Sequence, residues 1–463
     1  MRSELVVGVD SSTQSCKVMS VEVDTGKVVS TGSAPHPEGT EIDPRTWVAA
    51  LESASRGALD DCAAIGVAGQ QHGLVTIDAT GAPVRPALLW NDVRSAPQAH
   101  QLVSTYGAEW WARNTGSVPV ASMTITKLAW LAEHEPDSLR RTAEVVLPHD
   151  WLTGHLLGRT RDLVTDRSDA SGTGYYDPSG GRYLTDLLRE VTGHEFALPE
   201  VLGPSQPAGR TSSGALVAPG AGDNAAGAFG LEVEPGEVIV SLGTSGTVFT
   251  VDNSNTADER GLVAGFADCT GRFLPLACTL NAARVLAATA RLLDVDLATL
   301  SQLALAAPDD ADGLLLLPYL DGERTPNLPD ATGSLVGMTR ANMTPEHLAR
   351  AATLGMLCGI ADALDALRDN GVQAESVILI GGAAKSPAVR ALAPAVFGMA
   401  VDVAEEGEYV ARGAARQAAW VLGGDTAAPS WGRRVVASVP AEHPDWAAEV
   451  RARYAAAREQ LHG

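Results

Sequence analysis

The sequence predicts an α/β protein made of two halves with the same plan. Apolar strand patterns alternate with helical patterns in both halves, which is typical of the α/β class. Each half contains a Val-rich strand that runs into a short polar turn, at residues 5–15 and again at 237–246. With 463 residues, 45% of them apolar and 19% charged, the chain can bury sizeable cores.

The predicted strands follow a repeated order. They lie at residues 5–9, 17–23, 27–30 and 64–68 in the first half, and at 237–242, 247–251 and 376–380 in the second. The turns Asp10-Ser-Ser-Thr-Gln-Ser15 and Ser241-Leu-Gly-Thr-Ser-Gly246 can be laid over each other. A long internal repeat with its boundary near residues 231–237 is therefore plausible, although Gly turns commonly end unrelated strands.

Helices are predicted between these strands. Helical periodicity is found at residues 44–59, 124–133, 282–293, 345–368, 409–421 and 445–461. Thr344-Pro345-Glu346 provides an N-cap, a first-turn Pro and an acid, and Asn370-Gly371 provides a stop. The last of these helices is expected to be amphipathic.

Charge and composition restrict the partners. Lys and Arg total 34 and Asp and Glu total 56, a net charge of −22, which argues against nucleic acid and anionic membrane surfaces. No apolar run approaches the roughly 20 residues of a membrane helix. The five cysteines are widely spaced and no CxxC occurs, so we expect reduced, buried thiols. Because residues 1–10 show no signal peptide pattern, the expected location is the cytoplasm.

The usual nucleotide and hydrolase motifs are missing, so the candidate site is built from turns. There is no GxxxxGK[ST], HExxH or GxSxG, and Gly220-Ala-Gly-Asp-Asn-Ala225 matches GxGxxG only loosely. Strand-end turns with Gly, Ser and Thr can offer N–H and hydroxyl groups to phosphates. Asp10 could hold Mg²⁺ beside such a turn, or it could be a turn Asp that bonds its own backbone. Lys17 could bind phosphate or be a solvated strand residue.

Asp223 is the candidate general base. It lies at a predicted helix start between Gly222 and Gly227, where a ligand could approach the backbone closely. A carboxylate there could take a proton from a substrate hydroxyl, but an Asp at a helix start is also an ordinary N-cap.

Two further groups have side chains suited to a polyol. His72, in the turn after the predicted strand 64–68, could bind a hydroxyl or be a satisfied core histidine. Trp90-Asn91-Asp92 presents an aromatic face beside two polar side chains, which suits either a sugar or a structural corner.

Taken together, these residues resemble the FGGY family of carbohydrate kinases over nearly the whole chain, from Val6 to about Val421. Seven blocks match in order and spacing, and they are specific as a set: Ile65-Gly-Val-Ala-Gly-Gln-Gln-His-Gly73, Ala87-Leu-Leu-Trp-Asn-Asp92, Ser168-Asp-Ala-Ser-Gly-Thr173, Gly222-Asp-Asn-Ala-Ala-Gly227, Ser241-Leu-Gly-Thr-Ser-Gly246, Leu317-Pro-Tyr-Leu-Asp-Gly-Glu-Arg-Thr-Pro326 and Ile380-Gly-Gly-Ala-Ala-Lys-Ser386.

The resemblance implies a fold and an activity. It implies two actin-like, ribonuclease-H-like domains that flank a catalytic cleft, here residues 1–232 on the sugar side and 233–430 on the ATP side, with a helical extension at 431–463. It also implies Mg²⁺-dependent phosphorylation of a sugar by ATP. The Gln-His-Gly and Trp-Asn-Asp blocks favour D-xylulose, converted to D-xylulose 5-phosphate. The partners would be sugar and ATP, with no nucleic acid or membrane, and a homodimer is left open.

The resemblance also implies roles for residues. Asp223 would be the proton acceptor, and Asp10 would organise Mg²⁺ and the phosphates. The implied sugar contacts are Gln71, His72, Asn224, Trp90 and Asp92. The implied ATP contacts are Thr13, Lys17, Gly243 and Thr244 at the phosphates and Gly381, Gly382 and Ala383 at the adenosine.

Three positions depart from the family pattern. Ser12 and Ala383 stand where Gly is common, and Gln71 stands where Met is often seen, although no carboxylate is lost. The alternatives are a kinase for ribulose, gluconate, arabinitol or glycerol, or a non-catalytic sugar sensor on the same fold. A degenerate sensor would be expected to lose Asp10 or Asp223, and both are present.

Overall fold

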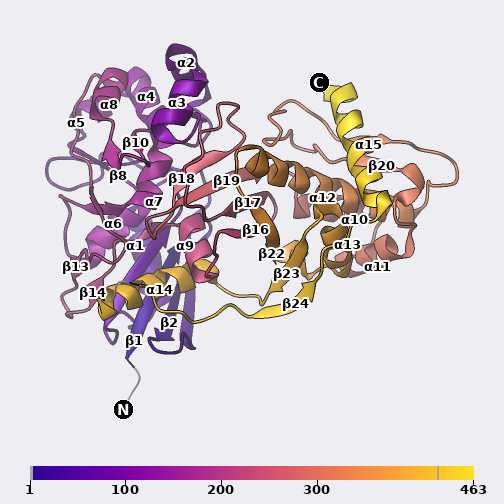
Figure 1. The fold of residues 1–463 in the computed structure, drawn as a ribbon. Coiled ribbons are helices and arrows are strands. Elements are labelled where there is room, and N and C mark those ends of the chain that lie inside the picture. Colours follow the sequence, from indigo (N-terminus) through magenta and orange to yellow (C-terminus); the bar gives the residue numbers. More distant parts are fainter. Residues whose placement is uncertain (1–3, 425–426, 463) are drawn as a thin grey trace.

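The protein is built around two large mixed sheets, each with its own set of helices (Figure 1). The structure is a computed structural model that describes residues 4–424 and 427–462. In the part of the chain that it describes, no helix combines the length and the apolar character needed to cross a membrane.

The first sheet has the order β13-β14-β5-β1-β2-β3, with β15 paired to β5. Its strands are β1 (Leu5–Ser11), β2 (Ser15–Glu22), β3 (Val28–Pro35), β5 (Ala64–Gly69), β13 (Gly209–Arg210), β14 (Leu216–Val217) and β15 (Ala221–Gly222). The associated helices are α1 (Arg45–Ser55), α2 (Ala96–Tyr106), α3 (Ala108–Thr115), α4 (Thr124–His134), α5 (Pro136–Arg141), α6 (Pro148–Leu156), α7 (Arg167–Ala170), α8 (Thr185–Thr192) and α9 (Asp223–Gly230).

The second sheet has the order β18-β19-β17-β16-β22-β23-β24. Its strands are β16 (Gly236–Leu242), β17 (Gly246–Thr250), β18 (Ala264–Ala267), β19 (Phe273–Thr279), β22 (Ala374–Ile380), β23 (Ala400–Ala404) and β24 (Val435–Val439). The later helices are α10 (Ala283–Leu292), α11 (Leu297–Ala306), α12 (Pro345–Asp369), α13 (Pro387–Phe397), α14 (Tyr409–Gly423) and α15 (Asp445–His462).

Short strand pairs and 3-10 turns complete the chain. The pairs are β4 (Glu41–Ile42) with β7 (Ala87–Leu88), β6 (Val75–Ile77) with β8 (Glu144–Val146), β9 (Val164–Asp166) with β12 (Glu200–Leu202), β10 (Tyr176–Asp177) with β11 (Arg182–Tyr183), and β20 (Leu315–Leu317) with β21 (Ser334–Val336). The 3-10 turns are η1 (Ser171–Thr173), η2 (Ala311–Gly313) and η3 (Gly382–Lys385).

The internal repeat predicted from the two turns is present in the sheet topology. In the first half, β1 pairs antiparallel with β2 and parallel with β5. In the second half, β16 pairs antiparallel with β17 and parallel with β22. In each sheet another strand, β3 in the first and β19 in the second, pairs antiparallel with the outer strand of the hairpin. The turns after β1 and β16 therefore occupy equivalent places in the two halves.

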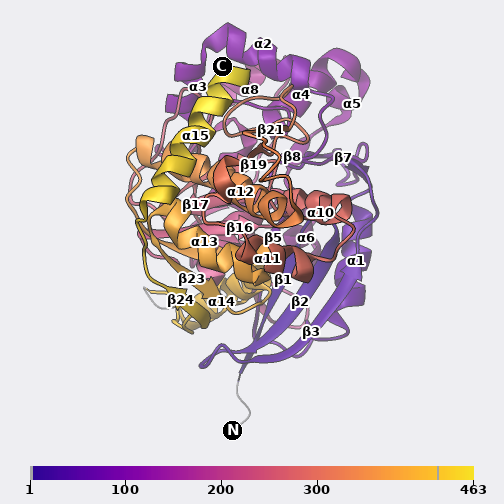
Figure 2. The same cartoon turned by 90° about the vertical axis from the view of Figure 1, so that its right-hand side faces the viewer.

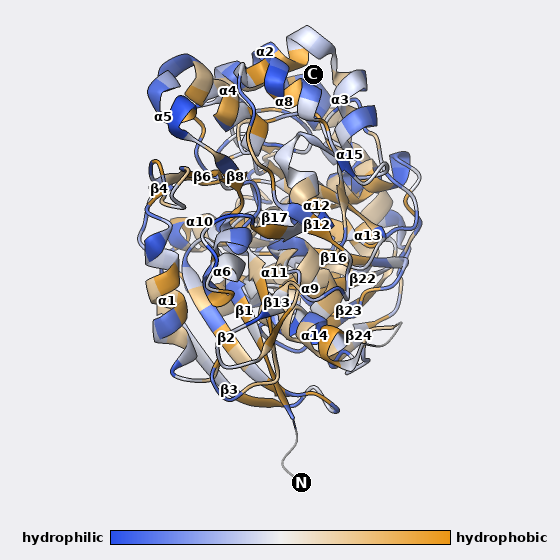
Figure 3. Cartoon of the chain, turned by 90° about the vertical axis from the view of Figure 1, so that its left-hand side faces the viewer, coloured by the Kyte–Doolittle hydropathy of each residue, from blue (hydrophilic) through white to orange (hydrophobic). Residues whose placement is uncertain are grey.

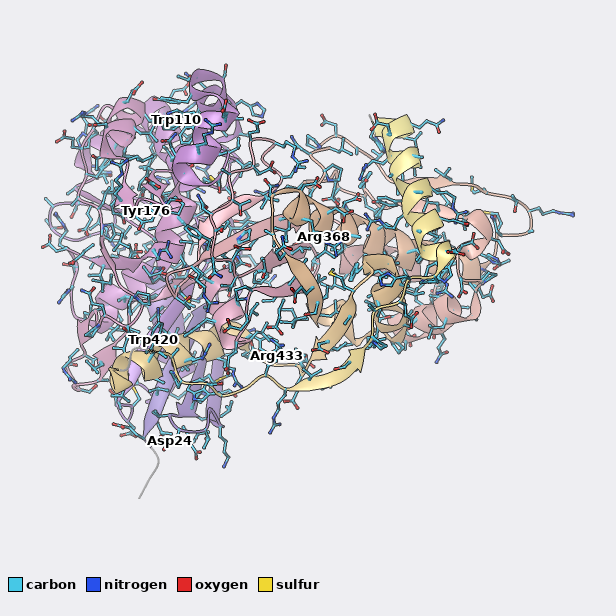
Figure 4. The ribbon with its side chains drawn as sticks, viewed as in Figure 1. Asp24, Trp110, Tyr176, Arg368, Trp420 and Arg433 are labelled. Carbon is cyan, nitrogen blue, oxygen red and sulfur yellow. The ribbon has the colours of Figure 1, made fainter. Side chains whose placement is uncertain are left out.

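Helix α14 crosses from the second half to the first. Its residues Ala411, Ala415 and Ala418 pack with Val6 of β1 and Ala64 of β5. Gly8 permits this approach, since a Cβ there would lie 1.8 Å from the Ala411 carbonyl oxygen. Figure 1 shows α14 beside the indigo strands, and Figure 4 labels its Trp420 on that side, away from Arg368 of α12. The start of α14 thereby reaches the region between the sheets.

Burial follows the hydropathy of the elements. In Figure 3 the orange, hydrophobic stretches gather on interior strands and helices, and blue ones are frequent on peripheral helices such as α5. The largest core surrounds α12, and it contains Leu354, Leu357 and Ile360 of this helix together with Val238 and Val240 of β16. Figure 2 shows α12 in front of the central strands. All five cysteines are free, and Cys16, Cys269 and Cys358 are buried.

Element boundaries differ from the predictions at a few places. Helix α1 ends at Ser55 and not at residue 59, because Arg56 takes a left-handed φ of 44°. Thr344 stands at the N-cap of α12, but its hydroxyl donates to Glu346 and makes no cap bond. Residues 431–463 were expected to be helical, and 435–439 form β24 of the second sheet. Helix α15 is amphipathic as predicted, with a buried stripe of Ala447, Val450, Tyr454 and Ala457.

Candidate active site

A cleft of about 760 Å³ opens where the turn after β1 faces the ends of β16 and β22. Both halves line it, and α9 and the start of α14 complete its wall. Six residues predicted from the sequence meet on this wall: Asp10, Lys17, Asp223, Asn224, Gly381 and Gly382. Residues from separate parts of the chain are thus brought to one site.

Asp223 is the first residue of α9, and Gly222 occupies the N-cap position. Oδ1 of Asp223 accepts hydrogen bonds from the backbone N of Asn224 at 2.8 Å and from Asn224 Nδ2 at 3.0 Å. Oδ2 has no hydrogen-bond partner among the described residues. Burial, and then the charges of Asp10 and Asp169, raise the pKa of Asp223 to about 7. A carboxylate with a free oxygen and this pKa can accept a proton at neutral pH, which an N-cap role would not require.

Asp10 lies near the end of β1, directly opposite Lys17 of β2, and only 4% of it is exposed. The hydroxyl of Ser12 donates to Asp10 Oδ1. Burial raises the pKa of Asp10 to about 6, against the lowering effects of the Ser12 hydrogen bond and the Lys17 charge. The charge of Asp10 also raises the pKa of Asp223, and both side chains line one cleft.

Lys17 has a specific partner. Its Nζ lies 2.6 Å from Glu408 Oε2, and Glu408 stands immediately before α14. Both side chains line the cleft and are partly exposed. The docking of α14 on the first sheet therefore brings a carboxylate to the lysine that the sequence placed near phosphate.

His72 lies at the end of the turn after β5 with a left-handed φ of 68°. Its Nδ1 donates to the Gly172 carbonyl at 2.6 Å, which fixes the proton on Nδ1 because a carbonyl only accepts. Burial lowers the pKa of His72 to about 3, so the ring is neutral and Nε2 is left as an acceptor. The His72 carbonyl accepts from Thr124 Oγ1 and from Lys127 Nζ, each at 3.2 Å.

Gln71 and Asn224 contact each other. Asn224 Nδ2 donates to Gln71 Oε1 at 3.1 Å, and Gln71 is 4% exposed. Asn224 lines the cleft, whereas Gln71 lies behind it.

The Trp90 block lies beside the first turn. Trp90 Nε1 donates to Thr13 Oγ1 at 2.7 Å, and Trp90 is 42% exposed. Asp92 is buried and accepts from Thr40 Oγ1 at 2.8 Å and from Arg94 Nε at 2.9 Å. These hydrogen bonds fit the structural corner that the sequence left as an alternative, and part of Trp90 remains exposed.

The two turns of the second half that were predicted to bind ATP differ in their surroundings. Gly243 and Thr244 follow β16, and their carbonyls accept from Ala283 N at 2.9 Å and from Arg284 Nε at 3.2 Å. Gly381 and Gly382 line the cleft, but Ala383 is 7% exposed and packs into the second-half core. Ala384 takes the place on the wall that the sequence suggested for Ala383.

Sequence reasoning missed two residues of this region. Glu408 precedes a predicted helix, where an acid is usually a helix-start residue, so nothing in the pattern linked it to Lys17. Lys127 lies inside a predicted helix and is fully buried, and burial lowers its pKa to about 7. A lysine on a helix is normally solvated, and no local signal distinguishes this one.

The residues on the wall suit a Mg²⁺ ion that is held jointly with phosphates. This ion usually takes one or two carboxylates and completes its shell with phosphates and water. Burial is the main reason that the pKa values of Asp10 and Asp223 are raised, and a cation would favour the charged forms of both carboxyl groups. Within the described ranges no three His, Cys, Asp or Glu side chains form a ready-made metal cage.

Comparison with known proteins defines the class. Residues 5–230 match the N-terminal domain of the FGGY family of carbohydrate kinases, and residues 238–422 match its C-terminal domain. These matches cover most of the chain, so the protein belongs to the FGGY family of carbohydrate kinases. The predicted family, the two-domain α/β fold and the kinase class with ATP as a substrate are thereby confirmed.

Individual relatives are named for one sugar. The chain is 48% identical over 438 residues to a xylulose kinase of Streptomyces rubiginosus, covering 91% of this chain and 89% of the relative. It is 33% identical over 439 residues to the Escherichia coli xylulose kinase, covering 89% of each. The crystal structure of xylulose kinase from Bifidobacterium adolescentis matches with a TM-score of 0.93 and 43% identity, over 99% of this chain and 100% of that one.

Proposed function

We propose that this enzyme transfers the terminal phosphoryl group of ATP to the terminal C5 hydroxyl of D-xylulose, giving D-xylulose 5-phosphate and ADP. The observation that carries the chemistry is the half-free carboxylate of Asp223, which shares a cleft with Asp10. The relatives named xylulose kinase support the choice of sugar.

Asp223 is assigned as the general base. A sugar hydroxyl is a poor nucleophile, so removal of its proton as it attacks assists the transfer. Oδ2 of Asp223 accepts that proton, the hydroxyl oxygen bonds to the terminal phosphorus, and the bond from phosphorus to the bridging oxygen of ADP breaks. With a pKa of about 7, about half of Asp223 is ionised at neutral pH, and that carboxylate is more basic than an ordinary Asp.

The phosphates are assigned to the turns after β1 and β16. Asp10 would hold Mg²⁺, which when bound neutralises phosphate charge. Phosphate oxygens would be contacted by Lys17 and Thr13 from the first half and by Gly243 and Thr244 from the second half. Lys17 can do so by exchanging its partner Glu408 for a phosphate. The turn of Gly381 and Gly382, with Ala383 behind it, would border the adenosine.

The sugar is assigned to the first-half side of Asp223. The free Nε2 of His72 and the side-chain carbonyl of Asn224 would accept hydroxyl donors, and the partly exposed Trp90 would cover the apolar face of the sugar. Asp92 would act from behind this wall by holding Arg94 and Thr40. A homodimer and a cytoplasmic location stay predictions of the sequence.

The test is turnover by Asp223→Asn. Asn keeps the size and the hydrogen-bond acceptor of Asp223 but cannot take up the proton. Loss of a general base typically costs about 10²–10⁴-fold in kcat. We expect that loss in a coupled assay for ADP with D-xylulose, in a protein of unchanged circular dichroism. Near-normal kcat would remove Asp223 from its assigned role.

A further inference from the structure

We propose that Gln71 is a positioning residue that holds the Asn224 amide against Asp223, and that it is not a ligand of the sugar. This inference rests on the proposed role of Asp223 as the base. It replaces the role in sugar binding that the sequence suggested for Gln71.

Both ends of the Gln71 side chain are occupied by the protein. Oε1 accepts from Asn224 Nδ2 at 3.1 Å, and Nε2 donates to the Ser168 carbonyl at 3.4 Å. Gln71 is 4% exposed. The same NH₂ group of Asn224 also donates to Asp223 Oδ1 at 3.0 Å. A continuous chain of hydrogen bonds therefore runs from Ser168 through Gln71 and Asn224 to the base.

The chemistry of the partners allows one orientation of each amide. An ionised carboxylate only accepts, so Asn224 must present its NH₂ group to Asp223. That group has two hydrogens, and the second points to an acceptor, which must be Oε1 of Gln71. The NH₂ group of Gln71 is then directed at the Ser168 carbonyl, which also only accepts. Each hydrogen bond therefore rules out the orientation in which the O and NH₂ groups of the adjoining side-chain amide are exchanged.

The far end of this chain is firmly held. Ser168 lies in α7, whose start is capped by Asp166, and Ser168 Oγ accepts from the backbone N of Gly222 at 3.0 Å. A Cβ at residue 222 would lie 2.7 Å from Gln71 Nε2, so glycine is needed there for Gln71 to pass. Ser168 therefore holds both Gln71 and Gly222, the residue before the base, which gives the block of residues 168–173 a supporting role.

Two consequences for the reaction follow. Oδ1 of Asp223 is kept as the acceptor of the Asn224 amide, so that Oδ2 is the oxygen left for the proton. The NH₂ group of Asn224 faces Asp223 and Gln71, so the Asn224 Oδ1 atom points away from both. Among the described residues, no group donates a hydrogen bond to Asn224 Oδ1. It can therefore accept a hydrogen bond from a sugar hydroxyl.

The experiment is Gln71→Met, which keeps the length of the side chain and removes both hydrogen bonds. We expect kcat with D-xylulose to fall about tenfold, the size of one lost hydrogen bond in the transition state, while KM for the sugar changes less than about twofold. We also expect the acid limb of the kcat profile to move to higher pH, because the Asp223 carboxylate loses a well-placed donor.

Two comparisons sharpen this result. Gln98→Met is the matched control, since Gln98 is also buried and donates through Nε2, to Glu133 at 2.7 Å, but lies in α2. It should leave kcat and its pH profile unchanged. In an Asn224→Ala background, Gln71→Met should have no further effect on kcat, because the link through which Gln71 acts is gone.

A several-fold rise in KM for the sugar with kcat and the pH profile unchanged would overturn the inference and make Gln71 a sugar ligand. If Gln71→Met is not folded, Gln71→Glu gives the same decision. It loses the donor to the Ser168 carbonyl, so kcat should fall while KM for the sugar changes little, and a raised KM with unchanged kcat would contradict the proposal. Retained turnover in Asp223→Asn would instead show that the proposed base is wrong, which is a separate failure.

Discussion

Lys17 Nζ lies 2.6 Å from Glu408 Oε2, although the two residues are 391 positions apart in the sequence. The pair joins the hairpin of β1 and β2 to the start of α14 on the wall of the cleft. Both side chains are more than a third exposed, at 37% and 45%, and exposed pairs of this kind contribute at most about 1 kcal/mol to folding. The ion pair therefore keeps Lys17 on the wall of the cleft, and little free energy is needed to separate Lys17 from Glu408 when a ligand binds.

Lys17→Met tests the phosphate role of this lysine. We expect KM for ATP to rise about tenfold, the effect of losing a hydrogen bond to a charged group, with little change in KM for the sugar. Glu408→Gln is the control, because it breaks the pair and keeps the ammonium, and it should leave KM for ATP unchanged or lower. Equal effects of Lys17→Met on both substrates would contradict this placement.

The pH dependence of the reaction should report Asp223. Its pKa of about 7 applies to the enzyme without nucleotide, so kcat/KM for the sugar is measured at ATP concentrations well below the KM for ATP, where that form predominates. As the pH falls through 7 the base becomes protonated, so kcat/KM should fall about tenfold per pH unit on the acid side and level off above pH 7. A profile measured at constant free Mg²⁺ that stays flat down to about pH 5 would show that no group with a raised pKa is required.

Asp10→Ala should separate the two substrates. Asp10 lies on the phosphate side, so we expect the variant to lose most of its Mg²⁺-ATP-dependent turnover while it still binds D-xylulose. Titration calorimetry with the sugar in the absence of nucleotide gives the measurement. Loss of sugar binding together with normal Mg²⁺ dependence would put Asp10 on the wrong side of the cleft.

The sequence predicted most of the fold because its signals are local. Strand 64–68 ends in a glycine turn, and helix 345–368 has its own start and stop signals, and both are present within a residue or two. The crossing of α14 to the first sheet has no local signal, because it depends on small residues such as Gly8 and Ala411 that meet only in the folded chain.

The sequence could predict site residues only where the local sequence around a residue carried the signal. Asp10 and Asp223 could be found because each is a carboxylate at the end of a strand or the start of a helix, and both lie on the cleft. Glu408 could not be found in this way, because it meets Lys17 only when α14 packs on the first sheet. Gln71 was predicted to contact the sugar, and its hydrogen bond to Ser168 could not be predicted because Ser168 lies 97 positions away.

His72→Ala should weaken the choice among sugars. A site that hydrogen-bonds a hydroxyl rejects analogues in which that group is misplaced, and His72 provides a fixed acceptor at Nε2. We expect KM for D-xylulose to rise and the preference over D-ribulose to shrink, with thermal stability followed as a check on folding. His134→Ala, at an exposed position that ends α4, is the control and should change neither. An unchanged preference in His72→Ala would assign the choice to other residues.

The most direct measurement of the central claim is kcat/KM with ATP across D-xylulose, D-ribulose, L-ribulose, D-gluconate, D-arabinitol and glycerol. The proposed function predicts that D-xylulose gives the highest value, and that its product carries the phosphate on C5. A clearly higher value for any other sugar would contradict the substrate assignment and leave the family membership standing.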